Sequence, residues 1–362
     1  MKVLITMRDM RKGSGVASCI MNYYQHSDVG IQFDFLLERY IDNPYQSLIQ
    51  EKKSKIYYLP KDTGKPNLKN YKYIDNVIKQ GHYDAVHVNT TGLNALIILK
   101  SARNHNIKKR IYHVHAPWVL YSLKTIIRNI IYERPTLRYA NKYVACSKSA
   151  GESVFRSKPY TILRNAIDIN KYTFDEFTRI KVRNELGIEL KLVVGTVARI
   201  SEEKNPRFLI DIFSEIRCIS KNAFLLWIGD GPLKDDIIKY AGEKLPPNSY
   251  FFAGRRDDAN LIYSAMDIFI LPSKYEGLGL CFIEAQASGL NCYGSDTVPR
   301  DVDITPLMHH ISLGNTPKEW AERITMDVNY DFKDQLRPCD ERIRRLFDVN
   351  EHVTYFNSIY ES

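Results

Sequence analysis

Short apolar runs alternate along the whole chain with segments whose hydrophobic residues have helical spacing. The runs are continuous and rich in Val, Ile, Leu and Phe, which is typical of parallel strands covered on both faces. The intervening segments, such as 67–79, 93–102 and 174–186, predict covering helices. The pattern therefore predicts an α/β protein with parallel sheets, with strands expected at residues 2–6, 31–37, 56–59, 85–88, 110–115, 142–145, 192–197, 223–228, 250–255 and 268–271.

The chain has 362 residues, which is enough for two domains that each bury a core. The α/β pattern restarts after segment 162–168, so we expect a boundary near residue 170. We therefore predict two Rossmann-like domains, at residues 1–170 and 171–345, and a C-terminal helix within residues 346–362.

Residues 267–289 combine a strand, a glycine-rich turn and a helix. The strand stops at Pro272, helical spacing starts at Leu280, and Gly289 is placed to end the helix. In this geometry several backbone N–H groups and the positive end of the helix dipole point at one spot. The turn is therefore predicted to bind an anion such as a diphosphate through the N–H groups of Gly277, Leu278, Gly279 and Leu280.

Two glutamates flank the predicted anion site. Glu276 lies at the lip of the loop, and Glu284 lies a little over one turn inside the helix. Carboxylates repel phosphate but accept hydrogen bonds from neutral hydroxyl groups, which sugars supply. We therefore expect Glu284 to bind a ribose diol and Glu276 to bind a transferred hexose. The alternative is that both are solvated surface residues.

In its glycine-rich context, the spacing of Glu276 and Glu284 resembles the signature of retaining glycosyltransferases of family 4, or glycosyl transferases group 1. The resemblance covers essentially the whole chain and is closest to bacterial capsular and exopolysaccharide transferases, through segments 111–115, 144–147 and 295–320. It implies the GT-B fold, with two facing Rossmann-like domains and a cleft between them. It also implies that the C-terminal helix crosses back to the first domain.

The resemblance further implies a nucleotide-diphosphate sugar, expected to be a UDP-sugar, in the second domain. A glycan or polyprenyl-diphosphate-linked saccharide acceptor would bind the first domain. Arg199 and Lys204 lie on one strand-to-helix loop, where the family has its leaving-group clamp, and two cations there would neutralise the diphosphate without a metal ion. Gly229 belongs to a turn that the family shares, and Arg255 to a turn that borders the base.

Gly15 and His115 are the candidate site residues of the first domain. The segment 13–18 is an imperfect dinucleotide-binding fingerprint, and in the family Gly15 would let the backbone approach the sugar. His113 and His115 share one strand face, and with His87 they could form part of a metal site, but no acidic or cysteine ligand is obvious. A histidine bonded only to backbone is the other alternative. The resemblance favours a sugar contact by His115, which is nearer the carboxyl end of its strand.

The net charge of +9 conceals an asymmetry between the two halves. Residues 1–165 carry 27 Lys and Arg against 11 Asp and Glu, a balance of +16, whereas the remainder carries 24 against 31, a balance of −7. The first domain is therefore expected to meet an anionic partner, and no nucleic-acid motif accompanies it. Residues 118–142 combine isoleucines with recurring cations. They are interpreted either as a surface lying on an anionic membrane or as an ordinary helix with a solvated basic face.

The six cysteines are scattered without a C-x-x-C pair, and no apolar run is long enough to span a bilayer. A reduced, cytoplasmic protein is expected, at most peripheral on the inner face of the membrane. No cofactor and no metal ion are expected. Two other classes stay open: an NAD-linked enzyme that uses the turn at 13–18, and a catalytically silent paralogue that binds carbohydrate or membrane.

Overall fold

The computed structural model describes residues 1–11, 14–28, 30–41, 43–60, 68–117, 127, 129–256, 258–326 and 337–361. The chain divides into two compact units. Unit 1 comprises Met1–Ile167 together with Val349–Ser362, and unit 2 comprises Asp168–Asp348. The chain therefore passes between the units twice, whereas the sequence placed the corresponding boundaries near residues 170 and 345.

Unit 1 is built on a seven-stranded parallel sheet with the order β3-β2-β1-β4-β5-β6-β7. The central strands are buried along almost their full length, as their continuous apolar sequences predict. In register, Thr6 of β1 lies opposite Val88 of β4. The strands are β1 (Lys2–Met7), β2 (Gln32–Leu37), β3 (Ile56–Tyr58), β4 (Ala85–Val88), β5 (Lys109–Val114), β6 (Lys142–Ala145) and β7 (Thr161–Ile162).

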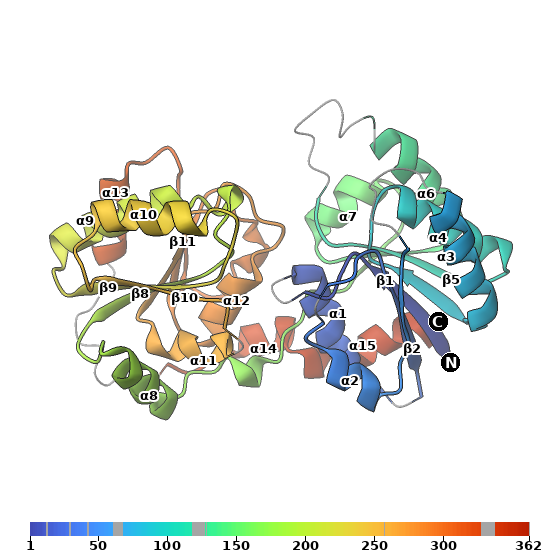
Figure 1. Cartoon of the computed structure of the whole chain (residues 1–362), viewed down its shortest axis with the longest axis horizontal. Coiled ribbons are helices and arrows are strands. Elements are labelled where there is room, and N and C mark those ends of the chain that lie inside the picture. Colours follow the sequence, from blue (N-terminus) through green and yellow to red (C-terminus); the bar gives the residue numbers. More distant parts are fainter. Residues whose placement is uncertain are drawn as a thin grey trace. The chain divides into compact units, whose positions relative to one another are not determined.

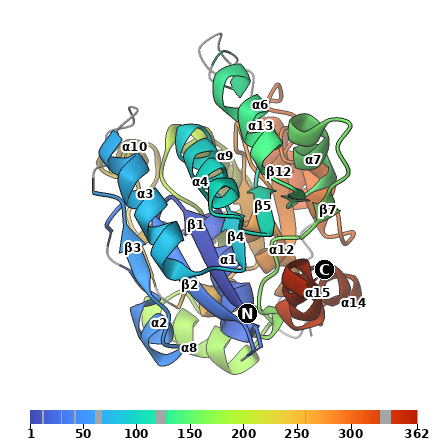
Figure 2. The same cartoon turned by 90° about the vertical axis from the view of Figure 1, so that its right-hand side faces the viewer.

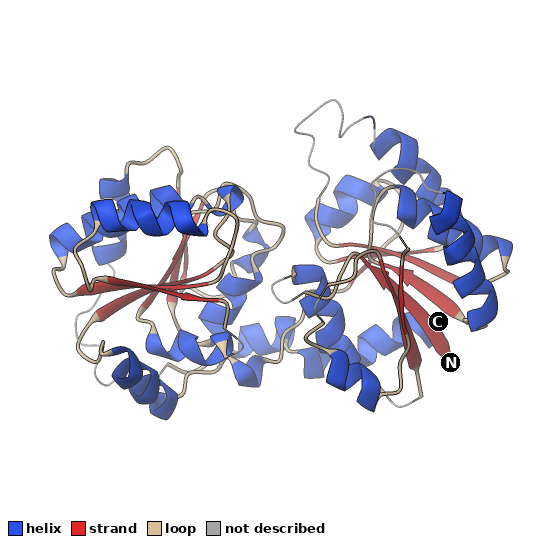
Figure 3. Cartoon of the chain, viewed as in Figure 1, coloured by secondary structure: helices blue, strands red, loops and turns tan. Residues whose placement is uncertain are grey.

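Helices cover both faces of this sheet, and each face has its own hydrophobic core (Figures 1 and 3). One core is formed with α1 (Gly15–His26), α2 (Gln46–Glu51) and α15 (Val349–Glu361). The other is formed with α3 (Leu68–Gly81), α4 (Leu93–Asn104) and α7 (Lys148–Phe155). The helices α3 and α4 lie side by side (Figure 2). A π-helical turn, η1 (Asn129–Glu133), leads into α6 (Arg134–Tyr139), which packs on α4.

Unit 2 repeats this architecture with a six-stranded parallel sheet in the order β10-β9-β8-β11-β12-β13. One face packs on α9 (Pro206–Ile219), α10 (Lys234–Lys244) and α13 (Pro317–Met326). On the opposite face lie α8 (Glu176–Leu186), α11 (Ala259–Ile262) and α12 (Leu280–Ala287) (Figure 1). The strands are β8 (Leu192–Val197), β9 (Ala223–Ile228), β10 (Tyr250–Gly254), β11 (Ile268–Leu271), β12 (Asn291–Ser295) and β13 (Met308–Ile311).

Short elements complete unit 2. The single turns of 3-10 helix are η2 (Ile169–Lys171), η3 (Glu202–Lys204), η4 (Tyr263–Ala265) and η5 (Arg300–Val302), and α14 (Glu341–Phe347) precedes the second passage between the units. Among the described residues, no helix is long and apolar enough to cross a membrane.

Candidate functional site

The loop between β11 and α12, residues 272–279, contains a row of unpaired backbone donors. Gly279 caps α12 with a φ of 85°, in the left-handed region, and a methyl group there would lie 3.0 Å from the Phe282 ring. Glycine is therefore required at this position. Within the described part of the chain, four successive N–H groups at this helix start donate no hydrogen bond, and they could bind an anion: those of Gly277, Leu278, Gly279 and Leu280.

Glu276, at the lip of this loop, is buried and paired on two sides. Its Oε1 lies 2.5 Å from Lys204 Nζ and accepts a hydrogen bond from Ser273 Oγ at 2.8 Å. The carbonyl of Ser273 in turn accepts hydrogen bonds from Ser295 Oγ at 2.5 Å and Thr297 Oγ1 at 2.7 Å. In this structure, the two side chains predicted to hold the sugar and the diphosphate are thus paired with each other.

The loop that carries Lys204, between β8 and α9, is bonded directly to the β11–α12 loop. The N–H groups of Lys274 and Tyr275 donate to the Glu203 carbonyl, at 2.8 and 3.4 Å, and Lys274 also forms an ion pair with Glu202. Arg199 on the same loop is exposed and makes no hydrogen bond or ion pair with any described residue. Its guanidinium is therefore available to a ligand at this edge of the sheet.

Gly229 and Gly231 allow the chain after β9 to pass very close to the β8–α9 loop. A methyl group at Gly229 would lie 2.0 Å from the Ala198 carbonyl oxygen, and one at Gly231 would lie 2.1 Å from that of Ile200. The Gly229 N–H also donates to the Gly254 carbonyl at 2.8 Å, so the turn that bears the exposed Arg255 is held beside it.

These residues follow the carboxyl ends of four neighbouring strands, β10, β9, β8 and β11, which is the edge where open α/β sheets bind ligands. The structure thus brings the candidate residues of unit 2 to one sheet edge. Gly15 and His115 belong to unit 1.

Glu284, on α12, is held by Tyr263, whose ring packs against that of Tyr172. Tyr263 OH donates to Glu284 Oε2 at 2.6 Å. Burial raises the Glu284 pKa, and the two phenols, Tyr263 first and then Tyr172, partly offset that rise. Neither tyrosine was identified from the sequence, because each lies far from Glu284 along the chain and belongs to no recognised motif.

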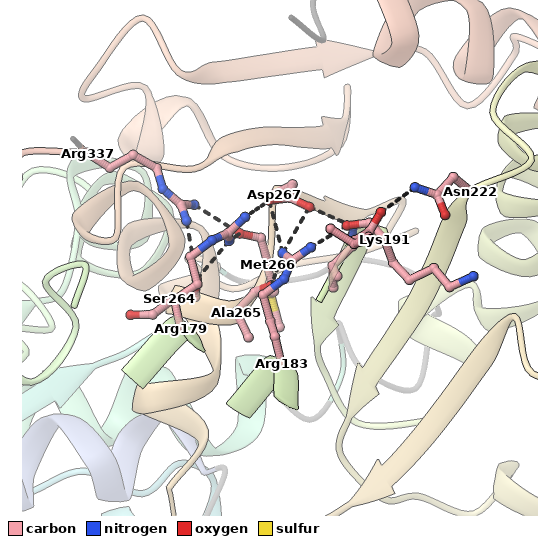
Figure 4. Close-up of polar contacts among 11 residues, drawn as sticks. Arg179, Arg183, Lys191, Asn222, Ser264, Ala265, Met266, Asp267 and Arg337 are labelled. Atoms are coloured by element: carbon pink, nitrogen blue, oxygen red, sulfur yellow. Dashed lines mark hydrogen bonds and ion pairs between the residues drawn. The ribbon is translucent and has the colours of Figure 1, made fainter. Parts of the chain in front are cut away.

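The strand that leads into the loop begins in a cluster of three arginines around Asp267 (Figure 4). Asp267 pairs with Arg179 at 2.5 Å and with Arg183 at 3.2 Å, and it accepts the Val193 N–H at 2.7 Å. Arg337 donates to the Met266 and Ser264 carbonyls, and burial together with Arg179 lowers its pKa to about 9. This network fixes the start of β11 and the end of η4. No motif in the sequence indicated this network.

In unit 1, His115 follows β5, is half-buried, and belongs to a connected set of side chains. Its Nε2 lies 2.8 Å from Asn89 Oδ1, and its ring is tilted against that of His113, with 3.9 Å between the ring centroids. His113 Nδ1 lies 3.2 Å from His87 Nε2, and His87 Nδ1 lies 2.5 Å from Tyr360 OH on α15. Burial lowers the pKa of His115 to about 4 and that of His87 to about 3, so all three rings are neutral at neutral pH.

The histidine grouping anticipated from the alternation of β5 is present, but its members bond to one another and to Asn89 and Tyr360. Among the residues that the structure describes, no group of three or more His, Cys, Asp or Glu is arranged to hold a metal ion. His115 Nδ1 is buried and has no hydrogen-bond partner there.

Gly15, the first residue of α1, is exposed, and a methyl group at that position would meet nothing within 4 Å.

The basic stretch at 118–142 is described only in part, because residues 118–126 and 128 lie outside the described chain. Three isoleucines in this stretch are about half exposed: Ile127 at 54%, Ile130 at 48% and Ile131 at 53%. Arg134 and Arg138, which both lie on α6, are exposed. The described isoleucines therefore do not pack fully inward.

Two family models match the chain. The model described as "Glycosyltransferase Family 4" matches residues 26–171, and the model described as "Glycosyl transferases group 1" matches residues 191–326. The first lies in unit 1 apart from its last four residues, and the second spans most of unit 2 with the loops described above.

Individual relatives agree with these matches. EpsF of Bacillus subtilis (strain 168), which is named as a glycosyltransferase, is 29% identical over 334 residues, 89% of this chain and 86% of EpsF. An Escherichia coli UDP-Gal:alpha-D-GlcNAc-diphosphoundecaprenol alpha-1,3-galactosyltransferase is 29% identical over 142 residues, 38% of this chain and 36% of that protein. The crystal structure of Anabaena HepE in complex with UDP and glucose matches 100% of this chain and 99% of its own, with a TM-score of 0.79 and 17% identity.

Proposed function

This chain belongs to the group 1, family 4 glycosyltransferases and has their GT-B fold of two Rossmann-like units, and from that premise we propose a specific reaction. The enzyme transfers a hexose-type sugar from a nucleotide-diphosphate sugar to a glycan or lipid-linked saccharide of a surface polysaccharide, with retention of anomeric configuration. Its likeness to EpsF over most of both chains supports the glycosyltransferase class.

The observation that carries the proposal is the row of unpaired N–H groups at residues 277–280 beside Lys204 and Glu276. A diphosphate at this helix start accepts from these donors, while Lys204 and the exposed Arg199 neutralise its charge without a metal ion. When Lys204 turns from Glu276 to the phosphate, the Glu276 carboxylate becomes free to accept hydrogen bonds from the sugar.

In the proposed reaction, the bond between the anomeric carbon and the diphosphate oxygen breaks. The acceptor hydroxyl oxygen forms a new bond to that carbon from the same face, and its proton passes to an oxygen of the departing diphosphate. Arg199, Lys204 and the loop N–H groups stabilise the developing negative charge. In unit 1, we assign Gly15 and His115 to contacts with the transferred sugar.

We assign the nucleoside to Glu284, Gly229 and Arg255. The Glu284 carboxylate accepts hydrogen bonds from the ribose hydroxyls, and the turns at Gly229 and Arg255 border the base. A UDP-sugar is the proposed donor, because the relative from Escherichia coli is named for UDP-Gal and HepE was solved with UDP.

For the acceptor side, we propose that unit 1 contacts an anionic membrane surface. The exposed isoleucines at 127, 130 and 131 adjoin the exposed Arg134 and Arg138, in the half of the chain whose charge balance is +16. Apolar side chains beside cations are the combination that binds an anionic bilayer interface. A lipid-diphosphate-linked saccharide would be reached from such a surface.

The donor proposal is tested by thermal shift with UDP, GDP, ADP and NAD, with and without EDTA. A ligand at 100 times its Kd adds about 2.7 kcal/mol of stability, which raises Tm by several degrees. We expect UDP to stabilise the protein equally with and without EDTA. Stabilisation by NAD alone, or by none of these ligands, would contradict the proposal.

Two variants then separate the roles of the glutamates. Glu284→Ala is expected to weaken UDP binding, whereas Glu276→Ala is expected mainly to lower turnover of the UDP-sugar. Unchanged UDP affinity in Glu284→Ala would rule out the ribose role. UDP binding without turnover of any sugar donor would favour the catalytically silent alternative.

The membrane proposal is tested by flotation with vesicles that contain phosphatidylglycerol. Replacing Ile130 and Ile131 by serine is expected to reduce flotation, and the same change at Ile180, which is 54% exposed on α8 of unit 2, is the matched control. Equal flotation of the three proteins would exclude this surface as the membrane contact.

A further inference from the structure

The two phenols around Glu284 form a second layer of the nucleotide site. Tyr263 is fully buried, and its hydroxyl donates to Glu284 Oε2 at 2.6 Å. The Tyr172 ring packs edge-on against Tyr263, with 5.9 Å between ring centroids, and Tyr172 also helps to lower the pKa of the same carboxylate. Neither phenol belongs to the residues that we assign to the diphosphate, the sugar or the base.

A carboxylate has about four acceptor positions, and the Tyr263 phenol occupies one of them. Two of the remaining positions match the pair of hydroxyl donors of a ribose diol. We propose that Tyr263, with Tyr172 packed against its ring, is a positioning residue that orients the Glu284 carboxylate as the acceptor for the ribose hydroxyls. This inference rests on the nucleotide-sugar function proposed above.

The position of Tyr263 is fixed by the arginine cluster of Figure 4. Tyr263 begins η4, and the carbonyls that end this turn accept hydrogen bonds from Arg179, Arg183 and Arg337, which donate to Ser264, Ala265 and Met266 at 3.0 to 3.2 Å. The Tyr263 ring also packs against Phe269 of β11, at a centroid distance of 6.0 Å. The phenol is therefore held in place before a ligand arrives, which lowers the entropic cost of ordering the site.

Few charged or titratable groups face Glu284 in the described chain. Tyr263 comes from η4, Tyr172 follows η2, and Cys281 lies on α12 itself. Burial raises the pKa of the Cys281 thiol, so that it is neutral, and the charges of Glu276 and Lys204 also act on this pKa. The two phenols are therefore the groups that oppose protonation of Glu284.

The test is UDP binding to the full chain by calorimetry from about pH 5 to pH 8, in wild type and Tyr263→Phe. Only ionised Glu284 accepts both hydroxyls, so affinity falls as the pH drops through the Glu284 pKa. Loss of a phenol bond raises that pKa further, so the fall in UDP affinity on the acid side should begin at a higher pH in the variant than in wild type. Wild type should also prefer UDP over 2′,3′-dideoxy-UDP by about tenfold or more, and the variant should lose most of this preference.

Tyr240→Phe is the matched control, because Tyr240 OH donates to the Asp211 carboxylate at the same 2.6 Å but joins α10 to α9. In this control, the pH dependence of UDP affinity and the preference for UDP over 2′,3′-dideoxy-UDP should equal those of wild type. If Tyr263→Phe does not fold, Tyr172→Phe at a half-buried position provides the same readout. If the folded Tyr variant has the same pH profile of UDP affinity and the same preference for UDP over 2′,3′-dideoxy-UDP as wild type, the inference alone is overturned. If the wild-type protein binds no UDP at any pH, the proposed function is overturned.

Discussion

A methyl group at Gly229 would lie 2.0 Å from a backbone oxygen, and the residue has a φ of 142°, which side chains rarely adopt. Gly229→Ala is therefore expected to destabilise unit 2 by at least about 1–3 kcal/mol and to weaken UDP binding, because the β8–α9 loop must move. Urea unfolding followed by hydrogen exchange in unit 2 measures the loss. Gly254→Ala is the control, since Gly254 also has a positive φ but nothing lies within 4 Å of its added methyl group. Equal losses in the two variants would show that close approach is not the cause.

Gly15 is in the opposite situation, because it is exposed and a methyl group there meets nothing within 4 Å. Gly15→Ala should leave stability within about 0.5 kcal/mol of wild type. If the Gly15 backbone approaches the transferred sugar, kcat with the UDP-sugar should nevertheless fall while UDP affinity stays unchanged. Wild-type kcat in this variant would remove Gly15 from the site.

At the scale of single elements, α15 is attached to unit 1 by aromatic packing. Phe356 stacks on Tyr23 of α1 at a centroid distance of 4.7 Å and is fully buried. Phe356→Ala should destabilise unit 1 by about 3–5 kcal/mol. Its neighbour Tyr355 is 44% exposed, and Tyr355→Ala should change stability by no more than about 0.5 kcal/mol. Denaturant unfolding of both variants measures the difference, and similar losses would contradict the packing argument.

The elements show why some of the fold could be predicted from the sequence. A buried parallel strand needs a continuous apolar run, and β4, β8, β9 and β11 have the bounds that such runs predicted. The glycine at 289 ends α12 with a φ of 67°, as its placement indicated. By contrast, the short elements α2, β7 and α14 have too few residues for a hydrophobic period to be evident.

The candidate site was predictable where its chemistry lies on one stretch of chain, as it does in residues 276–284. It was not predictable where partners come from distant segments. Glu276 and Lys204 are 72 residues apart in the sequence, and Glu284 and Tyr263 are 21 residues apart. Neither contact can therefore be predicted from a local residue spacing. The same holds for the arginines around Asp267, which as single surface-type residues carry no signal in the sequence.

For the whole molecule, the buried histidines predict that unit 1 loses stability in mild acid. His87, His113 and His115 all lie in unit 1, and burial is the main cause that lowers the pKa of each below its ordinary value of 6.5. The unfolded chain therefore binds more protons than the folded one below about pH 6.5. Their contribution to stability is complete above that pH and is lost progressively as the pH falls toward the folded values, about 4 for His115 and about 3 for His87.

Within that window, each histidine contributes up to about 1.4 kcal/mol per pH unit to the slope of the unfolding free energy against pH. Urea unfolding between about pH 6.5 and pH 5, where most carboxylates stay ionised, should give a steep slope for unit 1 when hydrogen exchange resolves the two units. His113→Asn removes one titrating group and should reduce the slope by about a third. His82→Asn is the control, since His82 is exposed with a φ of 49° that asparagine tolerates. A wild-type slope in His113→Asn would mean that the acid sensitivity of unit 1 comes from groups outside the histidine set.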